Sequence, residues 1–218
     1  MTATQTASDV RPRLFLITPF DTIDDDATGK LGAALSGGDV ASVLIDPERL
    51  PADKAQTVTK ELVRICQASD VAALVRNDTQ LAGRAGADGV HVDTGTADLE
   101  AAMASFQPSR IVGAGRVANR HDALLIGETD VDYVLFGRLD RADGGSEDPD
   151  GLALAEWWSP IVEIPCVALA GESEHSVQTA CETGAEFIGI RGFVWNNHDG
   201  PADAVRKAND ILDQFADE

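Results

Sequence analysis

The chain has 218 residues, of which 44% are hydrophobic and 25% charged, and this is enough for a single domain with a full core. Asp and Glu number 37 against 17 Lys and Arg, so the formal net charge is −20 at pH 7. A field of that sign argues against nucleic acid and anionic membrane as partners, and any anionic ligand has to be held by local amides or individual arginines.

The first ten residues are polar and lack the apolar segment of a secretory signal peptide, so we expect residues 1–10 to be a disordered tail. We expect residues 11–218 to form a single domain. No apolar run approaches the ~20 residues that a membrane-spanning helix needs. Cys66, Cys166 and Cys181 show no C-x-x-C spacing, which predicts buried free thiols. Together these features predict a cytoplasmic protein.

Short apolar runs rich in β-branched residues alternate along the chain with segments of helical spacing. The predicted strands are Arg13–Thr18, Val40–Ile45, Val71–Val75, Gly89–Val92, Arg110–Ala114, Asp132–Gly137, Cys166–Ala170 and Glu186–Ile190. The predicted helices are Ala27–Ser36, Pro51–Gln67, a short one from Thr79 closed by Gly86, Ala97–Phe106, Asn119–Gly127, Leu152–Trp158, Ser176–Thr183 and Pro201–Phe215. Asn119 and Ser173 are expected to cap the helices that follow them.

The junctions from helix to strand share a plan, in which a glycine or small residue and then an acid precede the strand. The plan is clearest at Gly37–Val40, Gly86–Gly89 and Gly184–Phe187. Glycine allows the left-handed conformation in which helices often end. Such repeated units predict an α/β fold, a single-domain TIM (β/α)8 barrel. A doubly wound sheet is the alternative, but it should show a Gly-rich fingerprint where this chain has Thr18–Asp21.

In a TIM barrel the functional side chains gather at the carboxyl ends of the strands. Here those ends carry Thr18, Asp46, Asn77, Asp78, His91, Asp93, Gly115, Arg116, Arg138, Gly171, Arg191 and Gly192. Barrels often bind phosphate through backbone N–H groups after strands seven and eight. Phosphate binding is therefore predicted at Ala170, Gly171, Arg191 and Gly192. Glycines that only form tight turns are the alternative, and a carboxylate at Glu172 would repel phosphate.

Asn77, Asp78 and Asp93 follow adjacent predicted strands. Two carboxylates so placed can hold Mg²⁺ together with a diphosphate, which makes Asp78 and Asp93 candidate metal ligands. A helix cap is the alternative, because Asn and Asp commonly begin a helix without any ligand. His91 should share a strand face with Asp93, either as an acid–base group or as a histidine buried inside the barrel.

Several segments, in order from Leu14 to about Trp195, resemble the thiamine phosphate synthase/TenI family. They are Leu14–Thr18, Asn77-Asp78 with Ala87–His91, Asp132–Gly137 in a form closer to the TenI branch, Ile164–Gly171, and Gly184–Ile190. The resemblance implies a TIM barrel, often dimeric, which allows a homodimer here. It also implies a synthase that joins a pyrimidine diphosphate to a thiazole phosphate with Mg²⁺ and releases diphosphate. TenI-type members instead aromatise a thiazole phosphate tautomer with a histidine.

The chain departs from the family pattern after several strands. Ile45–Arg49 replaces the Gln-x-Arg-x-Lys that grips diphosphate in the synthases, and Gly115 stands near an expected Ser. The segment 138–145 has neither the Thr nor the Lys of the synthases, and Arg138 stands where TenI has its His. Asp93 is displaced from the magnesium-binding acid after strand four, and Thr96 lies nearer that place. Arginine stays protonated, so Arg138 is a poor base that can bind an anion or pair with Asp140.

Three hypotheses follow from the sequence. The first is a divergent thiamine phosphate synthase/TenI-like protein of thiamine biosynthesis, which binds a phosphorylated heterocycle such as thiazole phosphate. Its catalytic candidates are Asn77, Asp78, His91 and Arg138, with Arg116 as a further phosphate-binding residue. The second is a catalytically silent relative that binds a metabolite or a protein partner, which the missing Gln-x-Arg-x-Lys and His favour. The third is an unrelated phosphate-handling barrel enzyme that uses Asp93, His91 and Arg138.

Overall fold

A computed structural model describes residues 11–18, 27–47, 52–140 and 147–216. The expected disordered tail, residues 1–10, lies outside these ranges. So do parts of the divergent segments after the second and sixth strands, at 48–49 and 141–145. Over the described ranges, no helix combines the length and the apolar character needed to cross a membrane.

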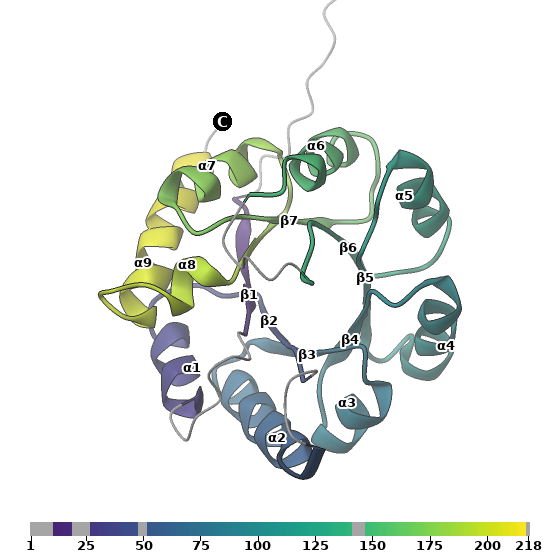
Figure 1. Cartoon of the computed structure of the whole chain (residues 1–218), viewed down its shortest axis with the longest axis horizontal. Helices are drawn as coiled ribbons and strands as arrows, with labels where there is room; N and C mark the ends of the chain where they lie inside the picture. The colour runs from purple at the N-terminus through teal and green to yellow at the C-terminus, as the bar shows by residue number, and fades with distance from the viewer. Residues whose placement is uncertain (1–10, 19–26, 48–51, 141–146, 217–218) are drawn as a thin grey trace, which may run out of the picture.

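Parallel strands close into a barrel inside a ring of helices, as Figure 1 shows. The strands are β1 (Arg13–Ile17), β2 (Ser42–Ile45), β3 (Ala72–Arg76), β4 (Gly89–Val92), β5 (Ile111–Ala114), β6 (Tyr133–Phe136), β7 (Cys166–Leu169) and β8 (Phe187–Ile190). Each pairs with the next, and β1 pairs with β8 to close the sheet, with Leu14 opposite Ile188. The predicted TIM barrel is confirmed, and the doubly wound alternative is wrong.

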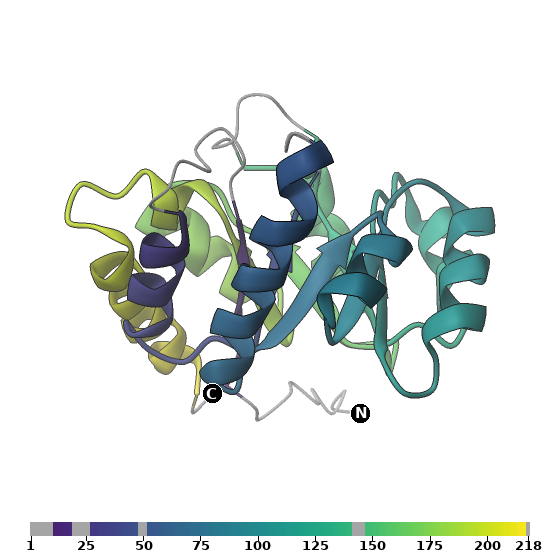
Figure 2. The ribbon, with the colours of Figure 1, turned by 90° about the horizontal axis from the view of Figure 1, so that it is seen from below.

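Helices follow the strands and stand along the outside of the barrel, as the side view in Figure 2 shows for α1 to α4. They are α1 (Ala27–Leu35), α2 (Ala52–Ala68), α3 (Thr79–Ala85), α4 (Thr96–Phe106), α5 (Arg120–Gly127), α6 (Pro149–Trp158), α7 (Glu174–Glu182), α8 (Gly192–Trp195) and α9 (Pro201–Leu212), with a 3-10 turn at Asp213–Phe215. Asn119 and Ser173 cap α5 and α7 as expected, and Gly86 ends α3 with a φ of 73°. The sequence pattern does not predict α8, a single turn directly after β8.

Side chains alternate between two apolar layers. Leu14 and Leu16 join the layer between the sheet and the helices, whereas Phe15, Ile17 and Leu74 belong to a separate cluster inside the barrel. The strands therefore have apolar residues on both faces, as the continuous apolar runs in the sequence indicated, and both layers exclude water.

The cysteines lie in the buried core as free thiols, which confirms that prediction. Burial raises the pKa of each thiol, at Cys66, Cys166 and Cys181, to about 12. They therefore stay protonated at neutral pH, and their part in the molecule is packing.

The acids at the helix–strand junctions bond the strand that precedes them. The carboxylates of Asp88, Asp132 and Glu186 accept from the backbone N–H groups of Ala73, Val112 and Cys166, at 2.8, 2.7 and 2.9 Å respectively. Each acid stands just before an even-numbered strand, and its partner belongs to the odd-numbered strand before it. These bonds satisfy N–H groups near the amino-terminal edge of the barrel.

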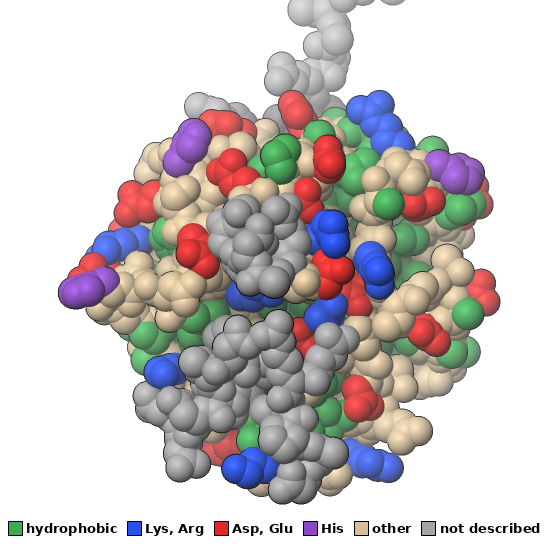
Figure 3. All heavy atoms as spheres, in the orientation of Figure 1, with side chains coloured by type: hydrophobic (Ala, Val, Ile, Leu, Met, Phe, Trp, Pro, Cys, Tyr) green, Lys and Arg blue, Asp and Glu red, His purple; other side chains and the backbone are tan. Residues whose placement is uncertain are grey.

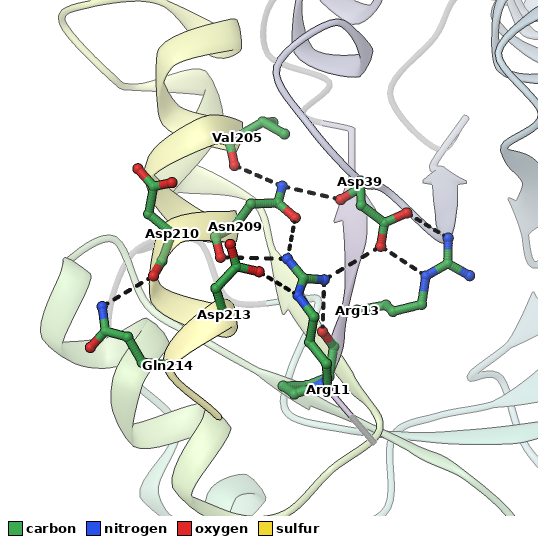
Figure 4. A network of polar contacts seen from close by, with 9 residues as sticks. Arg11, Arg13, Asp39, Val205, Asn209, Asp210, Asp213 and Gln214 are labelled. Carbon is green, nitrogen blue, oxygen red and sulfur yellow. Dashed lines mark hydrogen bonds and ion pairs between the residues drawn. The ribbon is translucent and has the colours of Figure 1, made fainter. Parts of the chain in front are cut away.

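Asp39, the equivalent acid before β2, bonds side chains instead, as Figure 4 shows. It receives two hydrogen bonds from Arg13 at 2.7 and 2.8 Å. Arg11 donates to Asp213 at 2.6 Å and to Asn209 Oδ1 at 2.8 Å, and Asn209 Nδ2 donates to the Asp39 carbonyl at 3.2 Å. This network joins the start of the chain's first strand to its last helix.

We expect Asp88→Ala to lower the free energy of unfolding by about 1–3 kcal/mol, because the Ala73 N–H loses its acceptor. Urea denaturation followed by circular dichroism measures the effect. Glu61→Ala, which removes the partner of the exposed Arg64 on α2, is the control and should leave the unfolding midpoint close to that of the parent chain. An Asp88→Ala midpoint equal to that of the control would contradict this role.

Candidate functional site

The carboxyl ends of the strands form one face of the barrel, which we call the mouth. Figure 3 views this face and shows Lys and Arg side chains close to the barrel axis, with carboxylates between them. Arginines stand at or just after the ends of several strands, namely Arg76 at β3, Arg116 at β5, Arg138 at β6 and Arg191 at β8. The mouth therefore brings arginines together with carboxylates, in a chain whose net charge is strongly negative.

Arg76, at the end of β3, lies between two carboxylates at this face. Its Nε and NH2 groups donate to Asp93 Oδ2 at 2.9 and 2.7 Å, and NH1 donates to Asp46 Oδ2 at 2.7 Å. The side chain is only 7% exposed. Burial alone would lower the pKa of Arg76, but the bond to Asp93 and the charges of both carboxylates raise it overall, so the guanidinium stays charged.

Asn77 and Asp93 bond each other reciprocally across β3 and β4. Asn77 Nδ2 donates to Asp93 Oδ1 at 2.5 Å, and the Asp93 backbone N–H donates to Asn77 Oδ1 at 2.9 Å. Asn77 adopts a left-handed backbone with a φ of 55°, a conformation that asparagine tolerates better than most residues. This geometry links the ends of two adjacent strands through side chains.

Asp78 caps a helix in this structure. Its carboxylate accepts from the Leu81 backbone N–H at 2.8 Å at the start of α3, and both oxygens of Asp93 already accept from Asn77 and Arg76. In the part of the chain that the structure describes, no group of three or more His, Cys, Asp or Glu side chains gathers to hold a metal. Among the described residues Asp78 and Asp93 thus do not form a shared magnesium site, and their assignment as metal ligands stays a prediction.

His91 lies inside the barrel with no exposed surface. Its Nδ1 is hydrogen-bonded to the Tyr133 hydroxyl at 2.9 Å, and within the described residues Nε2 has no partner. Gly113 of β5 and Gly115 just after it make room for this pair: a Cβ at Gly113 would lie 2.0 Å from the Tyr133 ring, and one at Gly115 would lie 2.5 Å from His91 Nε2. Burial lowers the pKa of His91 to about 4, so the imidazole is neutral at pH 7.

The expected phosphate-binding loops after β7 and β8 lie side by side. Gly171 and Gly192 are buried, and the Arg191 side chain donates to the Leu139 carbonyl at 2.9 Å. Ala170, also buried, donates its backbone N–H to the Gly189 carbonyl.

Glu172 occupies the space between these two loops. Its carboxylate packs against Gly192, where an added Cβ would lie 2.1 Å from Oε1, and it accepts from Asn196 Nδ2 at 2.8 Å. A phosphate at this place would compete with the carboxylate, so phosphate binding here stays a prediction.

Arg138 and Arg116 lie at the outer part of the mouth. Arg138 is 62% exposed and pairs with Asp140 at 3.2 Å, the ion pair considered from the sequence. The hydrogen bond from Arg138 holds the pKa of Asp140 below its usual value. Arg116 is exposed and has a φ of 58°. Neither arginine is buried, so both can change partners at little cost.

Comparison with known proteins settles the family. The sequence model described as "Thiamine monophosphate synthase" (TMP-TENI) matches residues 14–192. The chain belongs to this family. It is 35% identical over 204 residues to a thiamine-phosphate synthase of Rhodospirillum centenum, covering 92% of this chain and 97% of that protein. It is 34% identical over 212 residues to one from Hyphomonas neptunium, covering 94% and 96%.

Solved structures agree on the TIM-barrel fold. A thiamine phosphate pyrophosphorylase from Pyrococcus furiosus superposes with a TM-score of 0.79 at 22% identity, covering 95% of this chain and 98% of that one. A geranylgeranylglyceryl phosphate synthase from Thermoplasma acidophilum superposes with a TM-score of 0.67 at 13% identity, covering 94% of each chain.

Sequence reasoning missed two residues of this family member, Arg76 at the mouth and Tyr133 inside the barrel. One signal for Arg76 was available. It stands two residues after Leu74 at the end of an apolar run, so its side chain faces the barrel axis like that of Leu74. Its partners could not be read locally, since Asp46 and Asp93 lie 30 and 17 residues away on other strands. For Tyr133 the signal was the small Gly113 on the neighbouring strand.

We expect the buried His91 to make stability fall as the pH drops from about 6.5 to about 4. In this window the unfolded chain binds a proton at His91 that the folded chain does not, which removes roughly 3 kcal/mol of unfolding free energy by pH 4. Urea unfolding measured across this range tests it.

His91→Asn keeps a hydrogen-bonding group for the Tyr133 hydroxyl but cannot be protonated, so its unfolding free energy should depend less steeply on pH than that of the parent. His121→Asn, at an exposed histidine, should keep the parent's dependence. Equal slopes for the parent and His91→Asn would show that His91 does not titrate with folding.

Proposed function

We propose that the chain is a thiamine-phosphate synthase, which joins a pyrimidine diphosphate to a thiazole phosphate and releases diphosphate. The observation that carries the proposal is similarity along nearly the whole chain to proteins of that name. The arginines at the mouth support it, because a departing diphosphate bears about three negative charges that need partners.

In this proposal the two substrates divide the mouth between them. We assign the phosphate of the thiazole to the loops at Gly171 and Gly192, with Arg191 beside them. We assign the diphosphate to the opposite side, near Asn77 and Asp78. The exposed Arg116, and Arg138 in exchange for its ion pair with Asp140, can turn toward either anion. The bond from the pyrimidine methylene carbon to diphosphate breaks as the bond to the thiazole nitrogen forms.

The catalytically silent relative is the second candidate, and Glu172 is the observation in its favour. Its carboxylate lies against Gly192 and is held by Asn196, at the place assigned to a phosphate. The similarity to synthases along the whole chain favours the enzyme over this alternative. A homodimer, which the family resemblance allows, stays a prediction.

The purified chain is incubated with pyrimidine diphosphate, thiazole phosphate and Mg²⁺, and thiamine phosphate is measured by chromatography. Product from the parent chain is the expected result. A folded protein that forms no product contradicts the proposal. Thiazole phosphate binding without turnover would support the silent relative instead.

Asp78→Asn separates catalysis from helix capping, because the amide oxygen can still accept from Leu81 while the charge is lost. We expect kcat/KM to fall at least about tenfold, because the charged Asp78 is a predicted ligand of the Mg²⁺ that accompanies the diphosphate, while the thermal midpoint stays close to the parent value. Asp98→Asn, a first-turn acid of α4, is the matched control. Unchanged kcat/KM for Asp78→Asn would leave Asp78 with its capping role alone.

We expect Glu172→Gln to tighten thiazole phosphate binding several-fold, because it removes a negative charge from the assigned phosphate position while keeping the acceptor for Asn196. Isothermal titration calorimetry measures the affinity. Glu182→Gln, an exposed acid at the end of α7, is the control. Equal affinities for the two variants would place the phosphate elsewhere.

A further inference from the structure

Arg76 is a buried charge with an unusual set of neighbours. It ends β3 and faces the barrel axis, where it joins Asp46 after β2 to Asp93 after β4. A buried guanidinium costs several kcal/mol unless it is paired, and two carboxylates pair it here. Arg76 thus places a permanent positive charge at the mouth of the barrel. Its strand, β3, lies between the strands that precede the two acids.

The two carboxylates hold Arg76 unequally. Asp93 is 8% exposed, receives two bonds from Arg76, and is fixed from the other side by Asn77. Asp46 is 16% exposed and receives a bond from NH1. An anion that approaches from the mouth therefore competes with Asp46 more easily than with Asp93.

We propose that Arg76 binds the diphosphate of the substrate, and that Asp46 is its resting counter-ion, which the diphosphate displaces. The proposal rests on the proposed function, since it names a positive group for the diphosphate in a chain where Ile45–Arg49 replaces the Gln-x-Arg-x-Lys motif of the synthases. A guanidinium offers planar paired donors that match phosphate oxygens, and a diphosphate carries more charge than the single carboxylate it replaces. Asp93 stays bound and keeps the Arg76 side chain oriented.

The exchange leads to opposite effects for the two partners. Asp46→Asn removes the competing charge and leaves Arg76 in place, so diphosphate should bind more tightly. Arg76→Lys keeps one charge but loses the paired donors, so diphosphate should bind more weakly. If Arg76 had only a structural role, the two substitutions would change stability alone and would not shift the diphosphate affinity in opposite directions.

The test titrates the full chain with inorganic diphosphate in the presence of Mg²⁺ by isothermal titration calorimetry. We expect Asp46→Asn to raise the affinity about fivefold and Arg76→Lys to lower it about tenfold. Arg64→Lys, at an exposed arginine on α2, should not change it. Circular dichroism and the thermal midpoint verify that each variant is folded.

An affinity of Asp46→Asn equal to or below that of the parent overturns the proposal, and so does a parent chain that binds no diphosphate. The synthase assay is scored separately. Product formation together with an unaltered Asp46→Asn affinity removes this role of Arg76 and leaves the proposed function standing. If no product forms but Asp46→Asn binds diphosphate more tightly than the parent, the role of Arg76 stands and the proposed function is removed.

Discussion

Every second residue of a strand faces the barrel axis, and this constraint decides both the core and the mouth. Within the barrel, inward side chains such as Phe15, Leu74 and Leu135 are apolar, and His91 is hydrogen-bonded to Tyr133 among them. One step nearer the carboxyl ends the same alternation brings Arg76 to the axis, close to Asp93. Because little water reaches this level, the charges have to neutralise one another. The mouth is therefore a packed ionic layer resting on an apolar one, and a ligand has to exchange partners with it.

The fold could be predicted because its signals are local. Buried parallel strands are continuous apolar runs, and glycines such as Gly86 end the helices between them. The same junctions also contain contacts that a local sequence pattern does not predict. The pattern identifies Asp88 as a recurrent acid, but its acceptor role toward Ala73 depends on a strand 15 residues earlier. The single turn of α8 was missed because four residues carry no helical periodicity.

In the candidate site, too, contacts between sequence neighbours could be predicted, whereas contacts between distant segments could not. The cap at Asp78 and the ion pair of Arg138 with Asp140 are contacts between near neighbours in the sequence, and both were weighed from it. Asn77 and Asp93 meet because their strands are adjacent. The place of Glu172 against Gly192 depends on how two loops pack in space, so only its charge could be judged beforehand. The pairing of Arg76 with acids from strands on both sides depends on register, which a sequence does not display.

The departures from the family pattern are coupled to one another in space. The resemblance leads one to expect a Ser near Gly115, and any side chain there would collide with the ring of His91. The glycine and the buried, neutral histidine are thus one packing solution, completed by Tyr133 over Gly113. In the same way, Asp46 stands in the segment where basic residues are expected, and the positive charge beside it belongs to Arg76 of the next strand. A positive charge thus stands one strand away from the segment in which the family pattern places it, so counting missing family residues along the sequence does not describe the charges that meet at the mouth.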